Sequence, residues 1–337
     1  METSEEETVA RTYEVRTDGR PVIEKNRPVP APAAGEVLVR VKASSLNARD
    51  LPIVSGRYSR PVPPGRVPLS DGAGIVEAVG AGVSRFRAGD RVTSSFHPSW
   101  LYGSLDGWDE LYGVQLDGWL TEYIAVGEQS LVPVPEHLSF EEAATLPCAA
   151  LTAWSALSGV GPGDTVLLQG SGGVSIFALQ FARVAGARVL VTTSSAGKAQ
   201  RLRALGASDV IDYAGTPEWG ARVRQLTGGH GADLVVEIGG AGTIAQSITA
   251  LAQGGRISLV GNLADGDGMD LTQFLNRGAT LRTVTVGSRS DFERMNRVIS
   301  RHRLRPVVDR VFPFAEAPDA FTYFATGTHF GKVVIRH

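Results

Sequence analysis

Hydrophobic and polar positions change their pattern near the middle of this 337-residue chain. Before about residue 138, apolar and polar positions alternate in short stretches such as EVLVRVKA at 36–43, which predicts strands with one solvated face. Closely spaced Gly and Pro residues separate these strands, as is typical of a small β-barrel. From residue 164 onward, unbroken apolar runs alternate with helical segments, which predicts strands buried on both faces of a parallel sheet.

The expected fold class is therefore α/β, with a Rossmann doubly wound parallel sheet and a separate β-barrel domain. Within the segment LSFEEAA, Ser139 stands three residues before Glu142, a capping box that predicts the start of a helix. The final run KVVI predicts a strand that returns to the first domain. We expect domains at 1–137 and 138–287, with 288–337 returning to the first. Further strands of the parallel sheet are expected at 210–213, 234–238, 256–260 and 281–286.

The stretch 164–191, DTVLLQGSGGVSIFALQFARVAGARVLV, predicts a buried strand, a glycine turn, an apolar helix and a second buried strand. Gly170, Gly172 and Gly173, followed by Val174, would let the backbone turn sharply and approach a pyrophosphate at the helix N-terminus. Ser175 replaces the last glycine of the G-x-G-x-x-G pattern, and its small side chain is compatible with close packing. In this context the pattern indicates a dinucleotide site; an ordinary tight turn is the alternative.

The end of the second strand distinguishes between the two nicotinamide dinucleotides. An NAD site usually has Asp or Glu there to bind the ribose hydroxyls, but the sequence continues TTSSAGK without an acid. Hydroxyl groups followed by Lys198 and Arg201 suit a 2′-phosphate, which needs donors and a cation. We therefore expect NADP(H), with a merely solvated helix face as the alternative for the two basic residues.

Composition narrows the class of protein. The chain has 43% hydrophobic and 20% charged residues and a formal net charge of −2, which indicates a globular protein and argues against a nucleic-acid partner. We expect no membrane partner, since no apolar run approaches the roughly 20 residues that span a bilayer. The acidic start METSEEETVA lacks the apolar core of a secretory signal, so a cytoplasmic location is expected. One cysteine, Cys148, excludes an internal disulfide and a multi-cysteine zinc site.

Seven motifs in order along nearly the whole chain resemble the medium-chain dehydrogenase/reductase superfamily, and within it the zinc-free, quinone-oxidoreductase-like branch. The resemblance implies a GroES-like barrel domain and a Rossmann domain. The motifs are VKASSLNARDL (41–51), PLSDGAGIVEAVGAGV (68–83), GDRV (89–92), LSFEEAATLPCAALTAW (138–154), QGSGGVSIFALQFA (169–182), ALGASDVIDY (204–213) and HFGKVVIR (329–336).

Zinc-dependent relatives hold a catalytic zinc with Cys, His (usually followed by Glu) and Cys. At those positions this chain has Asn47, Ser70 and Cys148. One thiol cannot replace three protein ligands, so no metal is expected. The segment 96–116 also lacks the four cysteines of the structural zinc site in those relatives. Cys148 is expected to be a buried small residue rather than a reactive thiol.

Loss of the metal removes the Lewis acid that would polarise an alcohol or carbonyl oxygen. This favours NADPH-dependent reduction of activated C=C bonds in enones and enals, or of quinones, by hydride transfer, and the resemblance implies the same. One alternative is a zinc-free NADP(H)-dependent alcohol dehydrogenase or ketone reductase in a specialised pathway. Another is a non-enzymatic protein that binds NADPH or RNA.

The resemblance also implies which residues meet the substrate. Asn47 matches a position near the nicotinamide and the substrate oxygen, and Tyr58 matches a tyrosine that lines the substrate site. These are the expected catalytic residues; a buried structural Asn and a surface-loop Tyr are the alternatives. The aromatic, Gly-rich lobe at 94–117 suits a pocket wall, with self-packing as the alternative. Its expected pocket residues are Phe96, Trp100 and Tyr102.

Positions that match cofactor contacts in the family extend well beyond the glycine turn. They are Asn47, Thr152, Ser194, Lys198, Tyr213, Gly261, Asn262, Leu263, Val286, Ser288, Phe330 and Lys332. Relatives commonly pair through edge strands of their Rossmann sheets, so we expect a homodimer in which the strand at 281–286 forms the edge.

Overall fold

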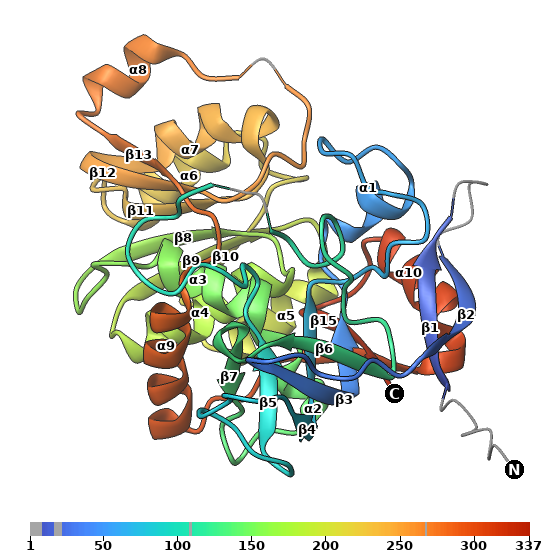
Figure 1. Ribbon diagram of the computed structural model, residues 1–337. Coiled ribbons are helices and arrows are strands. Elements are labelled where there is room, and N and C mark those ends of the chain that lie inside the picture. The colour runs from blue at the N-terminus through green and yellow to red at the C-terminus, as the bar shows by residue number, and fades with distance from the viewer. Residues whose placement is uncertain (1–8, 17–21, 108–109, 267) are drawn as a thin grey trace, which may run out of the picture. The chain divides into compact units, whose positions relative to one another are not determined.

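The computed structural model describes residues 9–16, 22–107, 110–266 and 268–337 and divides into two compact units (Figure 1). The first unit comprises Met1–Leu151 and Gly287–His337, and the second comprises Thr152–Val286. The C-terminal segment thus belongs with the N-terminal half, as the sequence predicts. The first boundary lies after Leu151 rather than at 137, because helix α2 (Phe140–Ala143) contacts strands β3 and β4 of the first unit.

The second unit is built on a parallel sheet in the order β10-β9-β8-β11-β12-β13. Strand β8 lies between β9 and β11, so the direction of strand order reverses there, as in a doubly wound sheet. The predicted final strand is shorter than expected, because β13 ends at Thr283. Its strands are β8 (Thr165–Gln169), β9 (Arg188–Thr193), β10 (Asp209–Asp212), β11 (Ala232–Glu237), β12 (Leu251–Leu259) and β13 (Thr280–Thr283).

Helices cover both faces of this sheet because its strands are apolar on both sides. On one face, Leu167, Val235 and Ile257 form a buried cluster with side chains of α6 and α7. Alternate residues point to the opposite face, where α4 packs on β8 and β9. The helices are α3 (Leu151–Ala156), α4 (Gly173–Val184), α5 (Ala196–Ala204), α6 (Trp219–Leu226), α7 (Ile244–Ala250) and α8 (Leu271–Asn276).

The turn between β8 and α4 explains why serine replaces the expected glycine. Gly170 has φ +69°, a left-handed conformation that favours glycine, and Gly172 is the N-cap of α4. The Ser175 hydroxyl, buried in the first turn of the helix, donates to the Gln169 carbonyl oxygen at 2.6 Å. This bond ties the helix to the end of β8, and glycine could not form it.

The first unit contains an antiparallel hairpin, β1-β2, and a sheet of seven strands within the described residues. The sheet runs β14-β15-β3-β4-β5-β7, with β6 paired to β3. Val39, Val76, Val92 and Trp119 form part of its buried core. The strands are β1 (Val9–Val15), β2 (Val22–Pro28), β3 (Glu36–Ser45), β4 (Asp71–Val79), β5 (Arg91–Ser94), β6 (Tyr123–Gly127), β7 (Leu131–Pro133), β14 (Val308–Pro313) and β15 (Lys332–Arg336).

Short helices flank the strands of the first unit. Ser139 and Glu142 form the predicted capping box at the start of α2. A π-helical segment (Leu146–Ala150) follows and carries Cys148. The remaining α-helices of the described part are α1 (Asp50–Val54), α9 (Arg289–His302) and α10 (Ala317–Ala325). Throughout the ranges that the structure describes, no helix is both long enough and apolar enough to cross a membrane.

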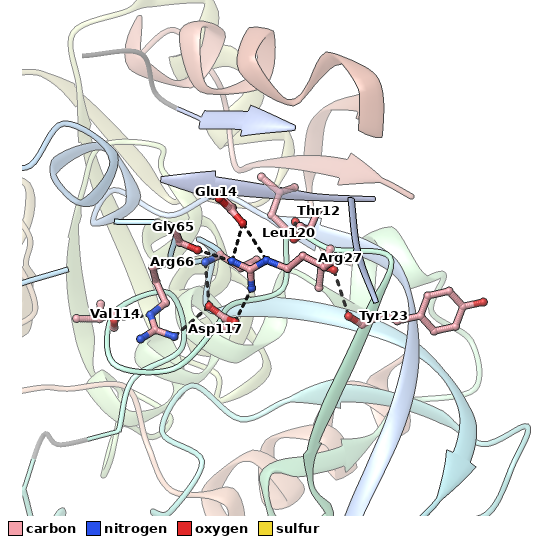
Figure 2. A network of polar contacts seen from close by, with 11 residues as sticks. Thr12, Glu14, Arg27, Gly65, Arg66, Val114, Asp117, Leu120 and Tyr123 are labelled. Atoms are coloured by element: carbon pink, nitrogen blue, oxygen red, sulfur yellow. Dashed lines mark hydrogen bonds and ion pairs between the residues drawn. The ribbon is translucent and has the colours of Figure 1, made fainter. Parts of the chain in front are cut away.

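An ionic network fastens the end of the aromatic lobe to the hairpin (Figure 2). Asp117 accepts from Arg27 at 2.8 Å, from Arg66 at 3.0 Å and from the Val67 backbone N–H at 3.1 Å. Arg27 also donates to Glu14 on β1 at 2.9 Å. The last residue of the lobe is therefore held by two arginines from separate segments.

Replacing Ser175 by Ala should destabilise the protein by about 1 kcal/mol, because the Gln169 carbonyl loses a buried hydrogen-bond donor. Ser175→Gly should cost about 1 kcal/mol more, since glycine is unfavourable within a helix. Urea unfolding of the full chain measures both changes. A wild-type midpoint for the Ala variant would contradict a stabilising role for the bond.

Asp117→Ala should destabilise the first unit by about 1 kcal/mol, a value limited by solvent screening because the side chain is 42% exposed. Asp117→Asn should cost less, because its amide oxygen can still accept from Val67 N–H. The gap between wild type and the Asn variant should shrink in high salt, which screens ion pairs. Unfolding midpoints at low and high salt test this, and equal losses for the two variants would contradict it.

Candidate functional site

Four segments, at residues 47–50, 71, 148 and 332, bring polar side chains together in the interior of the first unit. Asn47 follows β3, Asp50 begins α1, and Asp71 begins β4. Cys148 lies in the π-helical segment, and Lys332 begins β15. We refer to these five residues as the Asn47 cluster. Its members other than Cys148 are at most 7% exposed, so their charges and hydrogen-bonding groups are shielded from water.

Hydrogen bonds connect the Asn47 cluster. The Lys332 ammonium donates to the Leu46 carbonyl oxygen at 2.5 Å and to Asn47 Oδ1 at 2.6 Å. Asp50 Oδ2 accepts from the Asn47 backbone N–H at 2.7 Å. The two oxygens of Asp71 accept from the Ser70 hydroxyl at 2.7 Å and from the Cys148 backbone N–H at 3.1 Å.

Burial shifts the ionisation of every titratable member of the cluster. Desolvation raises the pKa of Asp50 to about 6, although the nearby Arg49 charge opposes this. Desolvation also raises the pKa of Asp71 and lowers that of Lys332, while their mutual attraction opposes both shifts. Burial and the Asp71 charge raise the pKa of the Cys148 thiol to about 12, so the thiol stays protonated.

A strained residue, Leu69, precedes Ser70 and Asp71 at the start of β4. Leu69 is fully buried and has φ +71°, which is unusual for a residue with a side chain. Its carbonyl oxygen accepts from the Trp119 N–H at 2.9 Å, and a Cβ at Gly118 would lie 2.2 Å from the same oxygen. Packing of the 118–119 backbone therefore maintains this conformation and directs Ser70 and Asp71 into the cluster.

Aromatic rings surround the Arg49 guanidinium beside the cluster. It lies 4.6 Å from the Phe96 ring centre and 5.5 Å from that of Tyr58. His97 packs edge-on against Phe96 and Trp100, and burial lowers its pKa to about 4, so it is neutral at pH 7.

The structure brings the expected substrate residues only partly together. Phe96 is buried, Tyr58 and Trp100 are partly exposed, and Tyr102 is 77% exposed. Tyr102 thus lies largely in solvent, unlike Phe96, and its place in a pocket wall stays a prediction. Trp108, another aromatic residue of the lobe, lies outside the described residues. A cavity of about 610 Å³ is lined by Tyr58, with Ile53, Arg60 and Pro61 among its other residues.

In the second unit, the glycine turn has the geometry of an anion site. It connects β8 to the 12-residue helix α4, so the free N–H groups of the helix begin at the strand end. A Cβ added at Gly170 or Gly172 would meet no atom within 4 Å, so the turn leaves open space beside its backbone. Gly173 and Val174 form the first turn of α4, where a phosphate could accept from their N–H groups.

A buried carboxylate fixes the loops next to this turn. Glu237, at the end of β11, is fully buried and accepts from Gln169 at 2.7 Å and from the Gly240 N–H at 2.9 Å. The hydroxyls of Thr243 and Ser247 also donate to it. The Gln169 side-chain oxygen in turn accepts from Ile238 N–H at 2.9 Å and from Gly239 N–H at 3.2 Å. The carboxyl ends of β8 and β11, where the strand order reverses, are thereby locked together.

At the strand end expected to bind a 2′-phosphate, Ser194 is exposed and Lys198 is partly exposed. Tyr213 is 44% exposed and immediately follows β10, the neighbour of β9. Ser195 is the N-cap of α5, where its hydroxyl accepts from the Lys198 N–H. These residues thus lie at the carboxyl ends of adjacent strands, as the motif implies.

Other expected cofactor residues of the second unit occupy varied environments. Thr152 is buried in α3. Gly261 follows β12, and Asn262 accepts from the Ala241 N–H at 3.0 Å, while Leu263 is 66% exposed. Val286 has φ +47°, a strained conformation for a β-branched residue at the end of this unit.

Besides Asn47, three expected cofactor residues lie in the first unit: Ser288, Phe330 and Lys332. The Ser288 hydroxyl caps α9 and donates to Asp291 at 2.6 Å. Phe330 is 1% exposed. Lys332 directs its ammonium to Asn47 rather than to solvent, a partner that only tertiary packing reveals. Its expected contact with the cofactor stays a prediction.

The sequence interpretation missed Asp71 and Arg49. Asp71 could have been found, because it stands where zinc-dependent relatives have the Glu after their histidine ligand. Arg49 gave no such signal, since its contacts come from Tyr58 and Phe96, on separate loops. Over the ranges that the structure describes, no group of three or more His, Cys, Asp or Glu residues could hold a metal ion.

Comparisons with known proteins agree with this architecture. Residues 33–136 match the alcohol dehydrogenase GroES-like domain, and residues 173–301 match the zinc-binding dehydrogenase domain. A zinc-type alcohol dehydrogenase-like protein of Schizosaccharomyces pombe is 45% identical over 314 residues, 90% of this chain and 91% of the relative. A 2-methylene-furan-3-one reductase of Solanum lycopersicum is 32% identical and covers 93% of this chain and 74% of its own.

Solved structures extend the comparison. A putative alcohol dehydrogenase of Sinorhizobium meliloti 1021 has a TM-score of 0.93 and 38% identity, covering 98% of this chain and 99% of its own. An NAD-dependent alcohol dehydrogenase has a TM-score of 0.89 and 36% identity, covering 97% and 99%. A crotonyl-CoA carboxylase/reductase in complex with NADP has a TM-score of 0.86 and 25% identity, covering 97% and 94%.

The two domain matches follow the two units in order, and the relatives cover nearly the whole chain. An oxidoreductase fold that binds a nicotinamide cofactor accounts for the parallel sheet, the glycine turn and the barrel-like first unit together. The chain belongs to the medium-chain dehydrogenase/reductase superfamily.

Proposed function

We propose that this protein is a zinc-independent, NADPH-dependent oxidoreductase that reduces carbon–carbon double bonds conjugated to a carbonyl group, or quinones, by hydride transfer. The observation that carries the proposal is the Asn47 cluster with the adjacent Ser70. At two of the positions that bind zinc in zinc-dependent relatives, the Asn47 amide oxygen and the Ser70 hydroxyl are already engaged in hydrogen bonds.

The candidate ligand atoms in and beside the cluster do not suit Zn²⁺. Asn47 Oδ1 already accepts from Lys332, and the Ser70 hydroxyl donates to Asp71. A divalent cation beside these groups would also be repelled by the Lys332 ammonium. Cys148 is the single thiol, whereas a catalytic zinc needs three protein ligands. Zinc-assisted polarisation of a substrate oxygen is therefore no part of the proposed reaction.

Reduction of a conjugated double bond needs less assistance than alcohol oxidation. Bound NADPH would supply a hydride for the β-carbon. As electrons move to the carbonyl oxygen, Asn47 Nδ2 donates a hydrogen bond to that oxygen and stabilises the developing negative charge. The α-carbon then takes a proton from water or from the Tyr58 hydroxyl, which balances the reaction.

The end of β9 supports NADPH rather than NADH. The sequence from Thr192 to Arg201 contains hydroxyls and two cations but no carboxylate. Lys198 follows the N-cap of α5, where the helix dipole also favours an anion. The 2′-phosphate of NADPH meets these requirements, whereas NADH carries no charge at that position. The similar structures include one described as NAD-dependent and one in complex with NADP, so the preference requires direct measurement.

A zinc-free alcohol dehydrogenase or ketone reductase is the second candidate. It is favoured by the similarity to the NAD-dependent alcohol dehydrogenase structure at 36% identity. In that reaction Asn47 would donate to the oxygen of a saturated carbonyl, so the two candidates differ in substrate rather than in the donor.

NADPH should bind at least about tenfold more tightly than NADH, because a charged hydrogen bond to the 2′-phosphate contributes about 1.5–3 kcal/mol. Lys198→Ala should weaken NADPH binding about tenfold and leave NADH binding unchanged. Arg203→Ala, an exposed residue on the same helix, is the matched control. Isothermal titration gives two dissociation constants for each protein, one for NADPH and one for NADH. Tighter NADH binding by wild type would overturn the cofactor assignment.

Turnover with NADPH should be faster for an enone or quinone than for a saturated ketone of similar size. Asn47→Ala should lower kcat for the enone about 100-fold, the scale reported for losing one oxyanion donor. Asn26→Ala on the exposed side of β2 is the matched control and should leave kcat unchanged. Cofactor absorbance follows each reaction. Turnover of ketones alone would establish the second candidate instead.

A further inference from the structure

Lys332 has a buried ammonium whose hydrogen bonds determine how Asn47 is oriented. The side chain belongs to a residue that is 3% exposed, and two acceptors lie within 2.6 Å of Nζ. One is the Leu46 carbonyl oxygen and the other is Asn47 Oδ1. Both acceptors come from adjacent residues at the end of β3, so Lys332 contacts the backbone and the side chain at the same point.

An ammonium group offers donors and no acceptor. The Asn47 atom that faces Lys332 must therefore be the amide oxygen, and the NH₂ group is forced to the other side of the amide. A reversed amide would place two N–H donors against the ammonium. The cation thus fixes a side-chain orientation that the shape of an Asn amide leaves ambiguous.

The nitrogen of the Asn47 amide, Nδ2, lies in a different environment from the oxygen. Nδ2 is itself buried and faces the Asp71 carboxyl, where it opposes the rise of the Asp71 pKa that burial causes. It forms no hydrogen bond of good geometry with any residue that the structure describes. The backbone N–H of Asn47 is held separately by Asp50 at 2.7 Å. Asn47 is therefore fixed at its backbone and at Oδ1, while Nδ2 keeps donor capacity.

We propose that Lys332 is a positioning residue, whose ammonium holds Asn47 Oδ1 so that Nδ2 is presented to the substrate oxygen. This proposal rests on the role given to Asn47 above. It holds equally for a conjugated or a saturated carbonyl, because both present an oxygen acceptor. Asp71 and Asp50 supply the negative charge that lets the ammonium stay buried.

A double-mutant cycle tests whether Lys332 acts through Asn47. Lys332→Met, Asn47→Ala and the double variant are compared with wild type, with Lys42→Met on β3 as the matched lysine-to-methionine control. We expect Lys332→Met to lower kcat by roughly 10- to 100-fold, a loss no larger than that of removing the donor itself. KM for NADPH should change little.

The test depends on how the effect of Lys332→Met on kcat changes when Asn47 is already replaced by Ala. In the Asn47→Ala background, Lys332→Met should change kcat less than about threefold, because the amide it orients is gone. Lys332→Arg, which keeps a cation and donors, should recover part of the activity. A purely structural role would instead give losses that multiply, with equal damage in both backgrounds, and this would overturn the proposal. A wild-type kcat for Lys332→Met or for Asn47→Ala would overturn it as well.

Lys332→Met removes the counter-charge of Asp71 and could prevent folding. In that case the cycle is repeated in an Asp71→Asn background, in which neither position 71 nor position 332 carries a charge once Lys332→Met is made. Losses that do not multiply again support the positioning role.

Failure of the proposed function is separable from failure of this inference. If wild type reduces saturated ketones only, the cycle is run with a ketone and still decides the role of Lys332. If enones are reduced but the losses multiply, the proposed reaction stands and the positioning role falls.

Discussion

A buried ammonium requires nearby negative charge, and the interior of the first unit is organised around this requirement. Removing one ion from water costs several kcal/mol unless partners compensate. Lys332 meets Asp71 and Asp50 together with two oxygen acceptors, and these groups come from β3, α1, β4 and β15. The antiparallel pairing of β15 with β3 brings the lysine to Asn47. The returning C-terminal segment thus contributes a buried cation to this unit as well as paired strands.

The second unit also buries a carboxyl group, and there hydrogen-bond donors rather than a cation satisfy it. Glu237 is fully buried, and its oxygens accept from four neutral donors: Gln169, Gly240, Thr243 and Ser247. Hydrogen bonds can satisfy a buried polar group when each of its acceptor atoms has donors. Because the donors come from both sides of the point where strand order reverses, the loops there cannot shift independently. This rigidity suits a turn that must present its backbone N–H groups to a ligand.

Local patterns predicted the fold well because they report local physics. Apolar runs located the parallel strands, the Ser139–Glu142 spacing located α2, and the glycine turn located α4. The site was less predictable. The motif placed Lys332 near the cofactor, but its partner Asn47 lies 285 positions away, and only strand pairing brings the two together. Similarly, the α9 cap uses the Ser288 hydroxyl, and Tyr102 points to solvent. Sequence shows which residues are available for chemistry, whereas packing decides which groups they meet.

The Lys332 ammonium also constrains how such a chain can evolve. Restoring a metal ligand at position 47 or 70 would place it beside an existing positive charge, so each single change would be unfavourable alone. Removing the lysine first would leave the Asp71 carboxylate buried without its cation. Substitutions that would build a metal site at positions 47 and 70 are therefore interdependent, because each one alters the charge balance around Lys332 and Asp71. Under the proposed zinc independence, a metal site at these positions would need several coordinated substitutions rather than one.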